Sequence, residues 1–350
     1  MEESQKRHEF QTLDALRGVA ATLVVVIHFA SCFGWYPQHG YLAVDMFFIL
    51  SGFVLSHAYQ SRLDSGRMSV PGFLRVRAIR LAPLYYLGLL AGVVVTASTH
   101  AYAKYGVTMA SHLQYFALNA FLLPVRGPSH VPPFPYNDPS WTLFLEFLVN
   151  AVHALFLRRA STGKLALVCG VAGAALVGYY VHAGHLNAGW AWPGLFTIGL
   201  ARVMFSYPLG MLLYRLWSSH KARIRFPASL SLCLAAAILA VRLPHEAEVA
   251  LIAILVAVPA VVYLAACNEP PAWLRLPFGL LGGASYAIYV LHWPFFSFAT
   301  HFWGNAQQNA PLSGLLLLAA LLCLSLAADA VYDRPVRKWL MRTLSRQREP

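Results

Sequence analysis

The stretch Leu13-Asp14-Ala15-Leu16-Arg17-Gly18 opens an apolar run that continues through His28 to Phe33. A helix of this length can cross the hydrocarbon core of a bilayer, which is about 30 Å thick. The run also carries ionisable groups at Asp14, Arg17 and His28, which a plain membrane anchor would not need. We therefore predict a first membrane span that also contributes to a functional site.

Arg17 and His28 are eleven residues apart, which corresponds to about 16 Å along a helix and places them on roughly one face. If Arg17 marks the cytoplasmic edge of the bilayer, His28 lies just past the midplane. A polar side chain at that depth needs a cavity or a partner. The alternative is a buried histidine that only packs against a neighbouring helix.

The composition predicts an all-α polytopic membrane protein. Of 350 residues, 58% are hydrophobic and 11% are charged, and the mean hydropathy is +0.56. A soluble protein carries about 25% charged residues. The net charge of +12 does not indicate a nucleic-acid partner, because most basic residues form short clusters between apolar runs, as expected for cytoplasmic loops. The five cysteines are dispersed and form neither a metal-binding motif nor a disulfide framework.

We predict a ten-span helical bundle with both termini in the cytoplasm. Residues 1–12 would be a cytoplasmic tail, 13–332 the membrane domain and 333–350 a basic cytoplasmic tail. The segment near 112–124 is too short for an easy crossing, so we interpret it as re-entrant or interfacial. The predicted spans are 13–33, 41–59, 81–98, 140–157, 165–182, 193–216, 226–243, 249–266, 279–298 and 312–331.

Four polar side chains from four different spans fall in the outer half of this bundle: His28, Asp45, Glu146 and His292. Each alone has a structural explanation, such as a hydrogen bond to a neighbouring helix. Histidine with carboxylate is a frequent arrangement for general acid–base catalysis. We predict a catalytic or ligand-binding site, in which either Asp45 or Glu146 orients the ring of His28.

A second cluster lies at the predicted inner face. Arg77 and Arg80 are three residues apart and share a helix face, and Arg17 begins the first span at the same level. These arginines could be topology signals that contact lipid head groups. They could also bind phosphate, because the planar guanidinium suits bidentate phosphate contacts. An inner phosphate clamp and an outer histidine layer suggest that a group is transferred across the membrane from a phosphorylated carrier.

The same residues resemble the motifs of the membrane-bound acyltransferase-3 family of polysaccharide and small-molecule O-acyltransferases. The similarity covers residues 12–340 and has small departures at Ala43, Thr142 and Asp333. The matching positions are Asp14-x-x-Arg17-Gly18 with His28, Ala43-Val44-Asp45-x-Phe47-Phe48-x-x-Ser51-Gly52-Phe53, Arg77-x-x-Arg80, Ser140-Trp141-Thr142-Leu143-x-x-Glu146, Ser285-Tyr286-x-x-Tyr289-x-x-His292-x-Pro294 and Asp333-x-Pro335.

The resemblance implies an acyl-CoA donor, usually acetyl-CoA, no metal, and a multi-pass protein of the bacterial inner (plasma) membrane. The donor phosphates would bind Arg17, Arg77 and Arg80. His28 would be the general base, or less readily an acyl carrier.

The acceptor side would involve Ser140 and Trp141, which would shape the acceptor entrance, and His292, which would hold the thioester or hydroxyl or have a structural role. We expect a glycan as acceptor, with a small secreted molecule or a lipid as the alternative. A transporter of an anionic substrate is less favoured, because the chain shows no inverted repeat.

Overall fold

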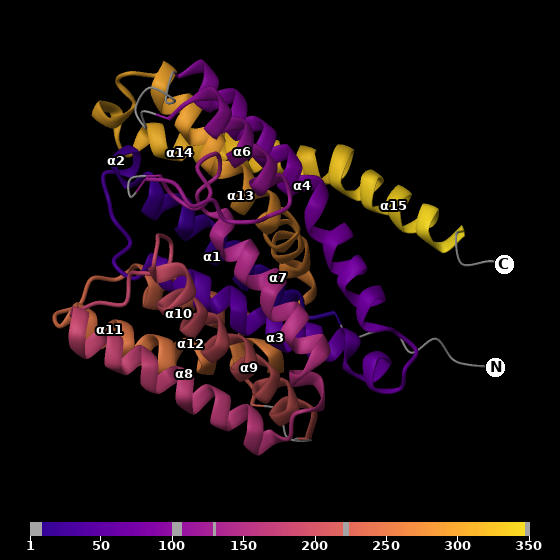
Figure 1. Ribbon diagram of the computed structural model, residues 1–350. Coiled ribbons are helices and arrows are strands. Elements are labelled where there is room, and N and C mark those ends of the chain that lie inside the picture. Colours follow the sequence, from indigo (N-terminus) through magenta and orange to yellow (C-terminus); the bar gives the residue numbers. More distant parts are fainter. Residues whose placement is uncertain (1–8, 100–106, 129–130, 220–223, 347–350) are drawn as a thin grey trace.

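The structure, a computed structural model, describes residues 9–99, 107–128, 131–219 and 224–346, and every regular element in these residues is a helix (Figure 1). Eight helical stretches are long and apolar enough to cross a membrane, which confirms the prediction of an all-α polytopic membrane protein. These stretches are Gln11–His28, Gly40–Asp64, Val70–Ser98, Thr162–Ala183, Gly194–Ser219, Glu246–Cys267, Ala272–Phe302 and Leu312–Thr343.

The helices follow the order of the predicted spans. They are α1 (Gln11–His28), α2 (Ala30–Phe33), α3 (Ala43–Asp64), α4 (Val70–Ser98), α6 (Met109–Ala120), α7 (Ser140–Leu155), α8 (Thr162–Ala183), α9 (Ile198–Ser219), α10 (Ala228–Ala240), α11 (Glu246–Ile252), α12 (Val258–Cys267), α13 (Arg275–Phe302), α14 (Leu312–Ala328) and α15 (Arg334–Arg346). Two shorter apolar helices, α7 and α10, coincide with the fourth and seventh predicted spans. The number of crossings and the side of each loop stay predictions.

Helices α1 and α13 form the centre of the bundle and approach each other closely at two glycines. A Cβ atom on Gly18 would lie 2.6 Å from the carbonyl oxygen of Leu281, and one on Gly282 would lie 2.7 Å from the Cβ of Asp14. Any side chain at these positions would force the helices apart. The two glycines therefore fix how α1 and α13 are aligned lengthwise.

Helix α4 begins well before the third predicted span. The Ser69 side chain caps it by accepting a hydrogen bond from the backbone N–H of Gly72 at 3.2 Å. Arg77 and Arg80 consequently lie on a continuous helix and point from the same side of it toward the bundle interior.

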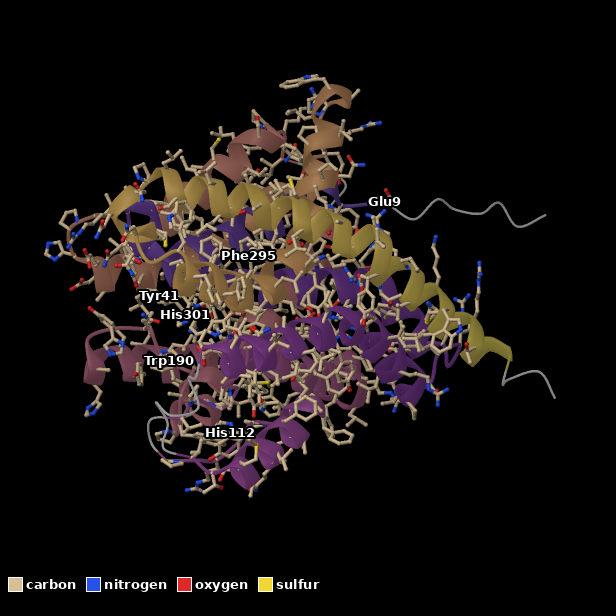
Figure 2. The ribbon with its side chains drawn as sticks, turned by 90° about the horizontal axis from the view of Figure 1, so that it is seen from above. Glu9, Tyr41, His112, Trp190, Phe295 and His301 are labelled. Carbon is tan, nitrogen blue, oxygen red and sulfur yellow. The ribbon has the colours of Figure 1, made fainter. Side chains whose placement is uncertain are left out.

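Helix α14 continues through a π-helical turn (Asp329–Asp333) into α15, so the basic segment expected as a tail after residue 332 is helical as far as Arg346. In Figure 1, α15 runs past α4 and beyond the rest of the bundle. In Figure 2, Glu9 lies toward the end of the molecule to which α15 extends, and Tyr41, Trp190 and His301 lie toward the other. The start of α1 and the C-terminal helix thus share one end of the bundle.

Candidate active site

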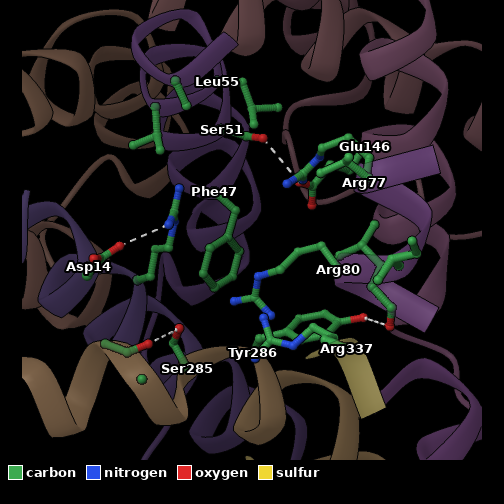
Figure 3. A pocket seen from close by; sticks show the side chains of 18 of the residues that line it. Asp14, Phe47, Ser51, Leu55, Arg77, Arg80, Glu146, Ser285, Tyr286 and Arg337 are labelled. Carbon is green, nitrogen blue, oxygen red and sulfur yellow. Dashed lines mark hydrogen bonds and ion pairs between the residues drawn. The ribbon is translucent and has the colours of Figure 1, made fainter. Parts of the chain in front are cut away.

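A cavity of about 960 Å³ opens between α1, α3, α4, α7, α13 and α15 (Figure 3). Its wall is strongly cationic. The basic side chains that line it are Arg17, Arg77, Arg80, Arg334, Arg337, Lys338 and Arg342, and the acidic ones are Asp14 and Glu146. The structure therefore brings the three arginines predicted as a phosphate clamp to one cavity.

Each of these three arginines has a carboxylate partner. An Nη atom of Arg17 lies 3.0 Å from Asp14, an Nη of Arg77 lies 2.7 Å from Glu146, and an Nη of Arg80 lies 3.6 Å from Asp333. The carboxylates hold the guanidinium groups in the cavity wall. The guanidinium of Arg80 also stacks over the ring of Tyr286 at 5.5 Å, and Figure 3 shows both side chains beside Arg337.

Glu146 had been predicted to lie with the histidines, but it lies elsewhere. Its carboxylate accepts hydrogen bonds from Arg77 and from the Ser51 hydroxyl, 3.1 Å away, inside the cationic cavity. The physical reason is charge, because a guanidinium among packed helices needs a counter-charge nearby. Glu146 on α7 provides this counter-charge for Arg77 on α4.

Asp45 has a different partner from the one predicted. The buried guanidinium of Arg202 on α9 lies 2.6 Å from the Asp45 carboxylate, and it also donates to the carbonyls of Tyr41 and Ala188, each at 2.8 Å. Both ionic side chains are at most 2% exposed. A pair so fully desolvated is held by these surrounding hydrogen bonds, which gives Asp45 a structural contact with α9 and no contact with His28.

The partner of His28 is His292. The Nδ1 atom of His28 lies 2.9 Å from the Nε2 atom of His292, and the two rings are parallel within 2°. Within the described residues this is the only hydrogen bond of the His28 side chain, so neither predicted carboxylate orients it.

The protonation of this pair follows from a backbone contact. Nδ1 of His292 lies 2.7 Å from the carbonyl oxygen of Tyr289, and a carbonyl can only accept, so Nδ1 carries the hydrogen. In the neutral ring, Nε2 of His292 is then an acceptor and receives the hydrogen of His28 Nδ1. This leaves the lone pair of His28 on Nε2, directed away from His292. His292 is fully buried, whereas His28 is exposed and can be approached.

On α13 the cavity ends one helical turn before His292, whereas on α1 its last lining residue is Arg17, eleven residues before His28. Following α3, α7 and α13 away from the α15 end, the last lining residues are Phe47, Thr142 and Tyr289. The rings of Phe47 and Tyr289 meet edge to face at 5.3 Å, and the Tyr289 hydroxyl lies 2.6 Å from the Thr142 hydroxyl. We call these three residues the cavity floor. Because the Tyr289 carbonyl also binds His292, one residue contacts both the cavity and the histidine pair.

Ser140 and Trp141, predicted at the acceptor entrance, are both buried. The Trp141 ring packs under the guanidinium of Arg202, 5.9 Å away, and so supports the Asp45–Arg202 pair. The Ser140 hydroxyl has no hydrogen-bond partner among the described residues.

The loop before α7 contacts α13 close to His292. Its Asn137 side chain donates to the carbonyl of Val290 at 2.9 Å, two residues before His292. The next residue, Asp138, has one carboxylate oxygen buried without a hydrogen bond in the described structure. Burial raises the pKa of Asp138 to about 7.

The basic residues of α15 were not among the predicted site residues. Arg334, Arg337, Lys338 and Arg342 had been assigned to a tail, yet all four line the cavity. Their spacing of three or four residues within a helical segment was the available signal. No group of three or more metal-ligating side chains lies together in the described part of the chain.

Comparisons with known proteins identify the family of this chain. The family model described as an acyltransferase domain, acyltransferase 3, matches residues 10–330. Protein 2 in the picA locus of Rhizobium radiobacter is 37% identical over 181 residues, which cover 48% of this chain and 93% of that protein.

The exopolysaccharide production protein ExoZ of Rhizobium meliloti (strain 1021) is 31% identical over 149 residues, which cover 42% of this chain and 44% of ExoZ. No solved structure matches the chain significantly. The fold and these matches define a multi-pass membrane acyltransferase. The chain belongs to the acyltransferase-3 family.

Proposed function

We propose that this protein transfers an acyl group, most simply acetyl, from acyl-CoA in the cationic cavity to a hydroxyl group of an extracytoplasmic glycan such as exopolysaccharide. One observation carries the proposal: a cavity lined by seven cationic side chains ends one helical turn from His292, whose ring contacts His28, a histidine with a free lone pair. The name of the relative ExoZ supports a polysaccharide acceptor over a small molecule.

The donor enters from the α15 end, which we assign to the cytoplasm of a bacterial inner membrane. Its phosphates bind the arginines of the cavity wall through charge-assisted hydrogen bonds. Its pantetheine arm extends along α3 and α13 toward the floor. The cavity wall follows α3 over twelve residues, from Phe47 to Tyr59, which corresponds to a length of about 18 Å.

His28 is the general base in this mechanism. Its Nε2 removes the proton of the acceptor hydroxyl while the oxygen attacks the thioester carbonyl carbon. The carbon–sulfur bond then breaks, and the departing thiolate takes the proton from Nε2. Thioester and alcohol become ester and thiol, and His28 returns to its neutral form. His292 keeps the proton of His28 on Nδ1 throughout and so serves as a positioning residue.

The reacting carbonyl has to pass the floor to reach His28. The Phe47 and Tyr289 rings therefore swing aside when the thioester enters, which breaks the hydrogen bond between Tyr289 and Thr142. Asp45, Trp141 and Arg202 hold the neighbouring helices fixed during this movement.

The test uses exopolysaccharide-producing cells that lack this protein and the same cells carrying the wild-type gene. The measured quantity is ester-linked acetate released from the surface polysaccharide by mild alkali. We expect acetate only where the wild-type protein is present. Equal acetate in both cells would overturn the glycan acceptor, and a purified protein that fails to bind acetyl-CoA would overturn the donor.

A further inference from the structure

The tryptophan that directly follows His292 on α13, Trp293, lies beside His28. The centroids of the Trp293 and His28 rings are 5.4 Å apart, and the two ring planes are nearly perpendicular, at 89°. Helix α13 therefore supplies two aromatic neighbours of His28: His292, which contacts it at 2.9 Å, and Trp293. The proposed mechanism gives a role to His292 and none so far to Trp293.

The Trp293 ring is supported by other aromatic rings. Its centroid lies 5.9 Å from that of Phe29, the residue that ends α1. Phe29 in turn packs at 4.6 Å against Phe296, which is fully buried. The ring of Trp293 is thus held by contacts within the same pair of helices that brings the histidines together.

The backbone at Trp293 is also fixed by a specific contact. The next residue, Pro294, has no N–H and cannot donate a hydrogen bond to the carbonyl of Val290 one turn earlier. The Asn137 side chain donates to that carbonyl instead, at 2.9 Å. The interruption of α13 at Pro294 is therefore stabilised from the loop before α7, and Trp293 lies within the stabilised turn.

Trp293 keeps part of its surface available. It is half-buried, and its indole N–H makes no hydrogen bond within the described structure. His28 beside it is exposed, and the Nε2 lone pair of His28 points away from His292. A molecule that brings a hydroxyl group to this lone pair therefore comes within reach of the Trp293 ring.

The position of Trp293 along α13 places it on the acceptor side of the floor. The cavity lining on α13 ends at Tyr289, four residues before Trp293. His301, eight residues after Trp293, lies toward the end of the molecule opposite to α15 (Figure 2). In the proposed mechanism the donor enters from the α15 end and the acceptor arrives from the other end.

The chemistry of an indole ring suits a sugar. A sugar ring carries C–H groups on its faces and hydroxyl groups around its edge. The electron-rich face of an indole attracts such C–H groups, and the indole N–H can donate to a hydroxyl oxygen.

We propose that Trp293 binds the acceptor by stacking against its sugar ring, which brings one hydroxyl group to Nε2 of His28. This inference rests on the proposed function, because it presumes a glycan acceptor and His28 as the base. The rival role for Trp293 is that of an anchor at the interface between membrane and water, where tryptophan is frequent.

The deciding experiment measures acetyl transfer from acetyl-CoA by the purified full-length protein. The acceptor is surface polysaccharide of the producing cells, freed of its ester groups by mild alkali and varied in concentration to give KM and kcat. Wild type is compared with Trp293→Ala, with Trp293→Leu, which is apolar but has no ring, and with Trp293→Phe, which keeps a ring. Trp303→Ala is the matched control, since Trp303 is an exposed tryptophan at the C-cap of α13. Thermal midpoints check that each variant is folded.

We expect Trp293→Ala and Trp293→Leu to raise the KM for the polysaccharide about 3- to 10-fold, as the loss of one aromatic stacking contact implies. The Kd for acetyl-CoA should not change in either variant. Trp293→Phe should stay within about twofold of the wild-type KM, and Trp303→Ala should match wild type.

The inference is overturned if the folded Trp293→Ala and Trp293→Leu variants keep the wild-type KM, as a membrane anchor would. It is also overturned if they lose kcat alone, which would mean that Trp293 only packs against His28, or if Trp293→Leu and Trp293→Phe have equal KM values. In all these cases wild type still acetylates the polysaccharide. If wild type transfers no acetate to it, the glycan proposal itself fails, and this inference fails with it.

Discussion

His28 and His292 meet ten residues beyond the two glycines that align their helices. Gly18 precedes His28 by ten positions on α1, and Gly282 precedes His292 by ten positions on α13. The close approach at the glycines and the 2.9 Å contact between the rings are thus separated by about 15 Å along both helices. The parallel packing of α1 and α13 is what creates the histidine pair.

Replacing His28 with alanine should abolish acyl transfer. Loss of a general base typically lowers the rate by 10²- to 10⁴-fold, and His28 does not line the cationic cavity in which we propose that the donor binds. Release of CoA thiol in the presence of acceptor should therefore disappear, while the Kd for acetyl-CoA stays within twofold of wild type. Wild-type turnover in this variant would contradict the assignment of His28 as base.

Replacing His292 should lower kcat without changing donor affinity, because this ring orients His28 from outside the cavity. His292→Phe removes the acceptor for the Nδ1 hydrogen of His28, and we expect a 10- to 100-fold loss of kcat. His292→Gln keeps an acceptor oxygen and should recover part of that loss. Equal kcat values in the two variants would indicate that His292 acts only through packing.

The double substitution Arg77→Ala with Arg80→Ala should weaken acetyl-CoA binding by about 10- to 100-fold, as expected for lost hydrogen bonds to charged groups. Calorimetric titration measures the change. The exposed Arg159, outside the cavity lining, offers a control as Arg159→Ala. Unchanged affinity in the double variant would mean that the two arginines serve topology alone.

Breaking the Asp45–Arg202 pair should cost stability. Removing one partner leaves a buried charge, at a typical cost of about 3–5 kcal/mol. Arg202→Met should therefore lower the thermal midpoint sharply. Arg202→Met combined with Asp45→Leu should restore most of the loss, since apolar residues often replace a buried pair at little cost. A fully folded, fully active Arg202→Met protein would show that the pair is dispensable.

Asp138 should make the protein less stable as pH rises. Its native pKa of about 7 lies above the value of about 3.9 for an unfolded aspartate. Between these values the native state holds a proton that the unfolded state has lost, so stability falls from about pH 4 to pH 7. Asp138→Asn should raise the thermal midpoint at pH 8 and leave it unchanged at pH 4. An equal shift at both pH values would contradict this.

Much of the fold could be predicted from apolar runs and basic clusters, because membrane crossing constrains sequence locally. The site was less predictable, because its pairings join distant segments. Asp45 and Arg202 are 157 residues apart, and nothing in the sequence distinguished that pairing from a contact with His28. Depth estimated from span boundaries also placed Glu146 too near the outside, because the tilt and overlap of α4 and α7 are set by packing.

The three predicted arginines were brought together because their helices all start at one end of the bundle. The contribution of α15 was missed for a related reason. In the sequence, a run of basic residues after the last span looks the same as a topology signal. Only the structure shows that the helix continues through Asp329–Asp333 and that the basic side chains of α15 line the cavity. Local patterns thus located the charged groups, and only the assembled bundle decided what each one faces.

The floor formed by Phe47, Thr142 and Tyr289 has an electrical consequence. Moving one elementary charge through a membrane voltage of 100 mV involves about 2.3 kcal/mol. If the cavity opens to the cytoplasm, as we propose, it carries the cytoplasmic potential inward, and most of the voltage drop then falls across the floor and the histidine pair. Under the proposed mechanism only the uncharged acyl group passes this barrier, and the polyanionic nucleotide never does. The proposed reaction therefore modifies molecules outside the cell without electrical work and without opening a path for ions.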